Sequence, residues 1–147
     1  MARVLKKQTD ARLLTDAAWA LYYITDGGGD KIAVVLKTDI APRLIELLAH
    51  TESRIALPAL RILGSIATGT DEQTQAIVDN GVLTTLKGLL GSASKGLRKE
   101  ACWALSNIAA GNPKQLLALL GAGILSMIVH ILRVDEFDVS DAAQCLI

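Results

Sequence analysis

Residues 101–111 read ACWALSNIAAG, and two related stretches precede them, AAWALYYITDG at 17–27 and ALRILGSIATG at 59–69. The copies are spaced by 42 residues, and this spacing aligns the glycines at positions 27, 69 and 111 without a gap. A second register follows twelve residues after each glycine, at Asp39, Gly81 and Gly123, each of which leads into an apolar stretch. A constant period of this length is typical of a repeat protein in which neighbouring units share one core.

Each repeat has the pattern of helices rather than strands. Apolar residues recur at intervals of three and four positions, as they do along one face of a helix. In the best-defined repeat the pattern predicts a short helix over 72–79, a second helix over 82–90 and a longer third helix over 97–109. No single repeat can bury its own apolar stripe, so the third helices of successive repeats should lie side by side along one concave wall.

Local signals mark where these helices begin, end and bend. We expect Gly69 and Gly111 to supply the left-handed turn that ends a helix. Asn112 followed by Pro113 has the order of an N-cap and first helical residue. Pro58 falls inside a predicted third helix, where it removes one backbone hydrogen bond and is expected to leave a tolerated kink.

Three helices per 42-residue repeat predict an all-α, right-handed α-solenoid of the armadillo type. We expect one solenoid domain over residues 1–147, with a partial repeat at 1–27, repeats at 28–69 and 70–111, and a partial repeat at 112–147. Because the chain begins within one unit and ends within a predicted helix, we also expect its uncapped ends to favour self-association.

Composition excludes several classes of protein. The 147 residues are 51% hydrophobic and 20% charged, with 15 basic and 15 acidic residues, which argues against disorder and against a strongly basic nucleic-acid binder. The uncharged stretch 116–132 is short for a membrane span and contains two glycines, so buried helices are the better interpretation. The N-terminus does not resemble a signal peptide.

No catalytic or cofactor site is expected. Cys102 and Cys145 are not closely spaced, which favours reduced, helix-packing thiols over a disulfide or zinc site. His50 and His130 lack metal-ligand spacing, and the glycines at 27–29 lack a phosphate-binding motif. We therefore predict a protein that is not an enzyme and binds no metal or cofactor.

A second stripe of residues runs along the third helices, at positions three before, at and four after a reference residue that recurs every 42 residues. Such positions share one face of a helix. The successive sets are Asp16, Trp19 and Tyr23; Pro58, Arg61 and Ser65; Glu100, Trp103 and Asn107; and Ala142 with Cys145. Both tryptophans of the chain occupy the same position of the repeat.

This stripe has the chemistry of a surface for basic, extended peptides. An indole face can pack against the stem and charge of Lys or Arg, a contact that contributes about 0.5–2 kcal/mol of binding free energy. An Asn amide can bond both the N–H and the C=O of a peptide backbone. An acid three residues before the Trp can pair with the cation. The alternative is that the tryptophans fill gaps between helices.

The segments DAAWAL (16–21), TGTDEQTQ (68–75) and KEACWALSNI (99–108) resemble importin-α (karyopherin-α), the armadillo adaptor that binds nuclear localisation signals. The resemblance covers nearly the whole chain and includes Tyr23 at an Asn position and Arg61 at a Trp position. It places the chain at about the end of the fourth to part of the eighth of ten repeats, as a divergent member. It implies a location in the cytoplasm and nucleus.

The resemblance also implies roles for single residues. Trp103 and Asn107 would grip the signal peptide, and Glu100 would pair with one of its basic side chains. Thr68, Asp71 and Thr74 match turn residues that contact a ligand Lys. Arg61 would shape the boundary between the minor and major sites, and Trp19, with Asp16, would edge the major site. Importin-β would bind the full-length protein through a segment that this chain lacks, as it lacks the export-receptor surface.

Three positions depart from the pattern of the family. Ser65 stands where Asn is usual, Ala142 where Glu is usual, and Cys145 where Trp is usual. These changes remove a backbone clamp, a carboxylate and an aromatic wall, so we expect weakened or altered binding at the minor site. The alternative function is that of a general armadillo scaffold that does not read nuclear localisation signals.

Overall fold

The computed structural model describes residues 1–7 and 10–134, and every regular element in these ranges is an α-helix. The all-α prediction is therefore confirmed. The helices are, in chain order, α1 (Ala2–Lys7), α2 (Ala11–Thr25), α3 (Gly29–Leu36), α4 (Ala41–Leu48), α5 (Ser53–Ile66), α6 (Asp71–Asp79), α7 (Val82–Leu90), α8 (Lys95–Ala109), α9 (Pro113–Gly121) and α10 (Ile124–Val134).

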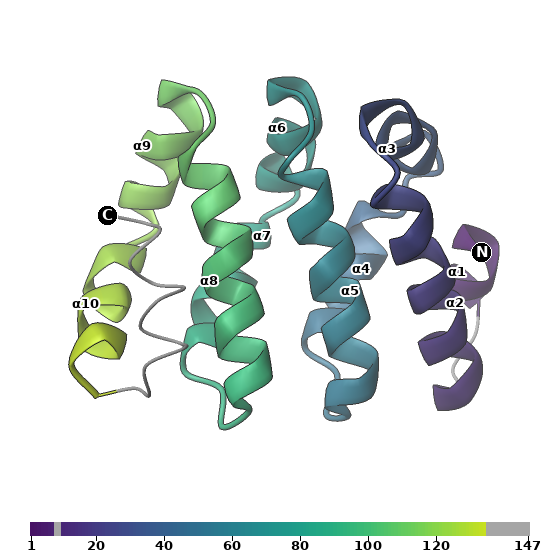
Figure 1. Cartoon of the computed structure of the whole chain (residues 1–147), viewed down its shortest axis with the longest axis horizontal. Helices are drawn as coiled ribbons and strands as arrows, with labels where there is room; N and C mark the ends of the chain where they lie inside the picture. Colours follow the sequence, from purple (N-terminus) through teal and green to yellow (C-terminus); the bar gives the residue numbers. More distant parts are fainter. Residues whose placement is uncertain (8–9, 135–147) are drawn as a thin grey trace.

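The helices follow the period of the sequence. α3, α4 and α5 form one repeat, α6, α7 and α8 form the next, and α9 and α10 take the first and second places of another. Figure 1 shows α2, α5 and α8 side by side along one face, with α4 and α7 behind them, and α5 packs closely against both α2 and α8. This layered stacking of third helices is that of the predicted α-solenoid.

The predicted helices of the central repeat lie close to the observed ones. α7 has the predicted bounds, and α6 begins one residue earlier than predicted. α8 begins two residues earlier, at Lys95, because the Ser94 hydroxyl accepts a hydrogen bond from the N–H of Leu97 and caps the helix. Local hydrogen bonds thus set the ends, and the apolar period sets the length.

One apolar core runs through the stacked repeats. Leu44, Leu86 and Ile128, which occupy the same repeat position, are 0%, 0% and 1% exposed. α5 has neighbours on both sides and is buried along nearly its whole length. It continues from Ser53 to Ile66 through Pro58, which is buried, so this proline is tolerated inside the helix as expected.

The prediction of a left-handed turn at Gly69 and Gly111 is wrong, because neither adopts a positive φ. α5 ends instead with tight bonds such as that from the N–H of Gly69 to the carbonyl of Ile66, 3.0 Å. A Cβ built at Gly69 would collide with the side chain of Gln73, and one built at Gly111 with that of Gln115. These glycines are needed for close approach rather than for a left-handed turn.

Left-handed backbone occurs instead at the second register, the positions twelve residues after each repeat glycine. Asp39, Gly81 and Gly123 have φ angles of 51°, 83° and 66°. Each separates the first helix of a repeat from the second. Asp is one of the few residues other than Gly that adopts this conformation, which explains why it can occupy the position.

Two glutamines cap helices and also join successive repeats. Gln73 and Gln115 each complete a capping box at the start of α6 and α9, with Thr70 and Asn112 as the N-caps. The Nε2 of Gln73 donates to the carbonyl of Gly29, 2.9 Å, and that of Gln115 to the carbonyl of Asp71, 2.8 Å. The first helices of neighbouring repeats are therefore locked in register.

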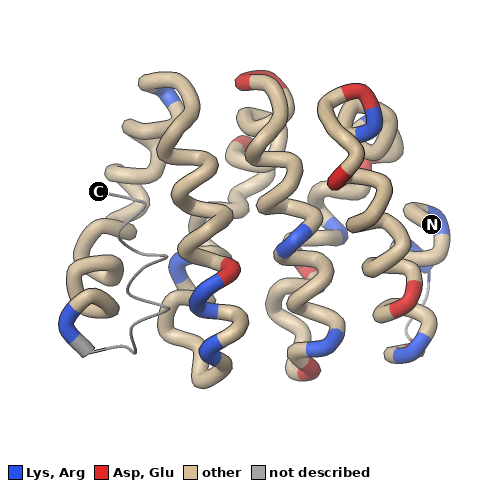
Figure 2. Tube along the Cα trace, viewed as in Figure 1, with Lys and Arg blue, Asp and Glu red and all other residues tan. Residues whose placement is uncertain are grey.

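Figure 2 shows that charged residues gather at the turns and in the lower half of that view, whereas the upper halves of α2, α5 and α8 carry few.

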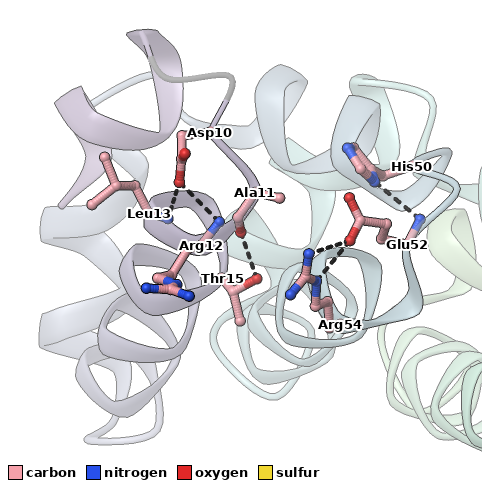
Figure 3. A network of polar contacts seen from close by, with 8 residues as sticks. All are labelled: Asp10, Ala11, Arg12, Leu13, Thr15, His50, Glu52 and Arg54. Atoms are coloured by element: carbon pink, nitrogen blue, oxygen red, sulfur yellow. Dashed lines mark hydrogen bonds and ion pairs between the residues drawn. The ribbon is translucent and has the colours of Figure 1, made fainter.

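Figure 3 shows the starts of α2 and α5, where Asp10 accepts hydrogen bonds from the N–H groups of residues 12 and 13 and Glu52 pairs with Arg54. His50 accepts a hydrogen bond from the N–H of Glu52, 3.1 Å, and so lies at a helix end.

In the described ranges, no one helix has both the length and the hydropathy of a membrane span. α9 and α10 reach that length and hydropathy only as a pair, and they are bent by 73° at the break between them.

Candidate functional site

The exposed side of α2, α5 and α8, here called the third-helix face, carries most of the residues singled out in the sequence. Trp103 and Asn107 lie on α8 and both contact Gly64 of α5. A Cβ built at Gly64 would collide with the six-membered ring of the indole, so the ring rests directly on the backbone of α5. The Nδ2 of Asn107 donates to the carbonyl of Gly64, 3.2 Å. Because Gly64 has no side chain, Trp103 and Asn107 can both approach the backbone of α5 at this point.

Part of each side chain remains available to a ligand. Trp103 is 37% exposed although its ring is held against α5. The Oδ1 of Asn107 accepts no hydrogen bond from the described residues. The pair therefore offers an aromatic wall and a hydrogen-bond acceptor on the same side of α8.

A hollow of about 220 Å³ lies beside Asn107, where α5 ends and α6 begins. It brings together four of the predicted residues, Thr68, Asp71, Thr74 and Asn107, with Ala67, Gly69, Ala110 and Gly111. Asp71 is exposed, whereas Thr74 is 3% exposed and its hydroxyl donates to the carbonyl of Ala67, 3.3 Å. A carboxylate, a carbonyl and an amide oxygen suit the ammonium group of a lysine.

Arg61 and Glu100 form an ion pair across the third-helix face. The Nε and Nη2 of Arg61 both donate to the Oε1 of Glu100, at 3.0 and 2.7 Å. The same guanidinium lies 5.5 Å from the centre of the Trp19 ring and 5.9 Å from that of Tyr22. The sequence interpretation gave Glu100 and Trp19 to a ligand cation, whereas in the structure both contact Arg61.

A second hollow, of about 330 Å³, is lined by this ion pair. Its walls are Tyr22, Arg61, Lys99, Glu100 and Trp103. Arg61 and Glu100 are 35% and 19% exposed, so solvent and ligands can reach the pair. The hollow spans α2, α5 and α8 and borders Trp103.

The other predicted residues differ in how far they are exposed to solvent. Tyr23 is 69% exposed, and its ring lies 6.3 Å from that of Trp19. Asp16 is exposed on α2. Ser65 is 4% exposed, so the structure does not present it to a peptide, because the end of α5 is packed on both sides. Ala142 and Cys145 lie outside the described residues.

Sequence reasoning missed Gly64, Tyr22 and Lys99. Gly64 had a detectable signal, since a glycine inside a predicted helix often marks close approach of another group. Tyr22 and Lys99 had none, because their role depends on the packing of neighbouring helices. Within the described ranges, no three His, Cys, Asp or Glu side chains come close enough to hold a metal ion.

The chain is similar to known armadillo-repeat proteins. Residues 70–110 match the model of the Armadillo/beta-catenin-like repeat. Importin subunit alpha-1b of Oryza sativa subsp. japonica is 46% identical over 61 residues, which are 42% of this chain and 11% of that protein. Importin subunit alpha-4 of Arabidopsis thaliana is 50% identical over 52 residues, 35% of this chain and 10% of that protein. The matched parts thus span about a tenth of these curated relatives.

Solved structures match over nearly the whole chain. A designed armadillo repeat protein in complex with the peptide (KR)4 superposes with a TM-score of 0.94 at 30% identity, over 99% of this chain and 60% of that one. An engineered protein superposes with a TM-score of 0.93 at 32% identity, over the same share of each chain. The chain is an armadillo-type α-solenoid, as the sequence predicts.

Proposed function

We propose that the third-helix face of this armadillo-type solenoid binds Lys- and Arg-rich peptides in extended form, and that nuclear localisation signals are its ligands. One observation carries the proposal: the hollow beside Asn107 gathers Asp71, Thr74 and Asn107 of one repeat with Thr68 at the end of the repeat before it. The similarity to importin α subunits and to a designed protein in complex with (KR)4 supports it.

The residues suggest how such a peptide is held. Trp103 provides a wall for the methylene stem of one basic side chain, worth about 0.5–2 kcal/mol. The Oδ1 of Asn107 accepts a backbone N–H of the peptide, which fixes the strand without reading its sequence. Asp71 and the Ala67 carbonyl accept the ammonium group of a lysine that enters the hollow. The negative charge of Asp71 favours Lys over a neutral side chain in the hollow.

The proposal extends to a role in transport. By similarity to importin α subunits, we propose that the protein is an adaptor for cargo, works in the cytoplasm and nucleus, and associates with importin-β through a segment beyond the matched stretches. Its chemistry is binding rather than catalysis.

A fluorescence-anisotropy titration with a labelled Lys/Arg-rich nuclear localisation peptide tests the proposal. The Trp103→Ala/Asn107→Ala double variant removes the wall and the clamp and is expected to lose binding at least tenfold, since each contact contributes about 1 kcal/mol or more. Asn80→Ala is a matched control, because Asn80 is an exposed amide at the end of α6 that bonds only within its own helix, to the carbonyl of Ala76.

The outcomes separate two functions. Saturable binding that the double variant loses and Asn80→Ala keeps supports the peptide receptor. Equal binding by all three proteins, or none by the unaltered chain, favours the alternative of a scaffold that holds partners through another surface. A peptide whose lysines are replaced by alanine shows whether binding depends on basic side chains.

A further inference from the structure

Arg61 makes within the chain the contacts that a basic ligand is expected to make. Its guanidinium lies over the Trp19 ring, and two of its nitrogens donate to one oxygen of Glu100. It reaches both from α5, which stands between α2 and α8 (Figure 1). An aromatic face and a carboxylate on either side of a guanidinium are a complete cation site.

We propose that Arg61 is an internal competitor for basic ligands, which holds Glu100 and Trp19 until a ligand cation displaces it. This inference rests on the function proposed above and adds how affinity at that surface is set. Because both hydrogen bonds go to Oε1, Glu100 keeps only Oε2 for a ligand. Arg61 therefore lowers affinity without closing the site.

The charges around the second hollow support this view. Arg61 and Lys99 contribute two positive charges to its walls and Glu100 one negative charge, so the hollow repels cations as long as Arg61 is in place. Without Arg61, the remaining walls are neutral overall and Glu100 has both oxygens free. Because the ion pair is partly exposed, separating Arg61 from Glu100 costs little free energy.

The test compares Arg61→Gln, Glu100→Gln and the double variant in the peptide titration described above. Arg61→Gln is expected to bind about fivefold more tightly, since the ligand cation no longer has to displace Arg61 from Glu100 and a like charge beside the ligand is removed. Glu100→Gln is expected to bind more weakly. Arg54→Gln is the control for net charge, because Arg54 lies on the same helix and pairs with Glu52 away from this surface.

The decisive comparison is the effect of Arg61→Gln when Glu100 is already Gln. If Arg61 competes for Glu100, the gain from its replacement is then much smaller, because only its charge and its contact with Trp19 are still removed. The proposal is overturned if Arg61→Gln binds no better than Arg54→Gln, or if its gain persists in full without Glu100. Loss of binding in Trp103→Ala/Asn107→Ala with no gain in Arg61→Gln contradicts this inference alone, whereas absence of peptide binding in every variant contradicts both it and the proposed function.

Discussion

Replacing Gly64 by alanine should have opposite effects on stability with and without Trp103. Gly64 lies inside α5, where a Gly-to-Ala change ordinarily stabilises a helix by about 0.5–1 kcal/mol. A new Cβ at this position collides with the indole ring of Trp103. Overpacking costs about 1–3 kcal/mol, and the ring, which is 37% exposed, can swing outward and keep the cost at about 1.5–2 kcal/mol.

We therefore expect Gly64→Ala to lower the free energy of unfolding by about 1 kcal/mol in the unaltered chain, the overpacking cost exceeding the gain in helix propensity. In the Trp103→Ala background the collision is gone, and Gly64→Ala should raise the free energy of unfolding by about 0.5–1 kcal/mol. The coupling between the two sites is then about 1.5–2 kcal/mol.

Urea unfolding of the four proteins of this cycle measures the coupling. Gly88→Ala is the matched control, because Gly88 lies inside α7 with no atom near a Cβ built there, so it should stabilise equally in both backgrounds. The reasoning fails if Gly64→Ala stabilises the protein by the same amount whether or not Trp103 is present. A swung ring would also weaken peptide binding in Gly64→Ala, which the anisotropy titration would detect.

Three further changes probe other contacts. Asp39→Gly should raise the free energy of unfolding by up to about 1 kcal/mol in urea denaturation, because glycine adopts a φ of 51° without strain; an unchanged midpoint contradicts this. Gln115→Leu should lower the melting temperature and cost about 1–3 kcal/mol, since the buried side chain of Gln115 no longer donates to the carbonyl of Asp71; a neutral result would contradict this. Backbone and Thr70 hydrogen bonds lower the pKa of Glu72 below its ordinary 4.5, so its stabilising effect is present above that pH and lost as the pH falls through the folded pKa. Unfolding measured at about pH 6 and about pH 3 should show a smaller loss of stability for Glu72→Gln than for the unaltered chain, and equal losses would contradict this assignment.

The fold was predictable because its determinants are local and repeated. The spacing of apolar residues indicated each helix of the central repeat to within two residues at either end. Gly69 shows the limit of that reasoning: a glycine at a helix end suggested a left-handed turn, but Gly69 has no positive φ, and the glycine makes room for Gln73 from the following helix.

The candidate site was predictable in composition but not in pairing. The four-residue spacing within one predicted helix indicated that Trp103 and Asn107 share a face, and the structure places Asn107 in one hollow with Thr74 and Asp71. The period could not indicate that Ser65, at the position equivalent to Asn107, would be 4% exposed. Exposure at equivalent positions depends on what the neighbouring repeat packs against them.

The sequence by itself determined which residues form helices, that Asn112 caps the start of α9 and which positions recur on the third helices, because these depend on bonds and contacts within one or two turns. Only the tertiary structure decided that Arg61 pairs with Glu100 and that Trp103 rests on Gly64. Each of these contacts joins residues about 40 positions apart, on α5 and α8, and so depends on how two neighbouring helices are rotated and offset, which their separate periodicities do not specify.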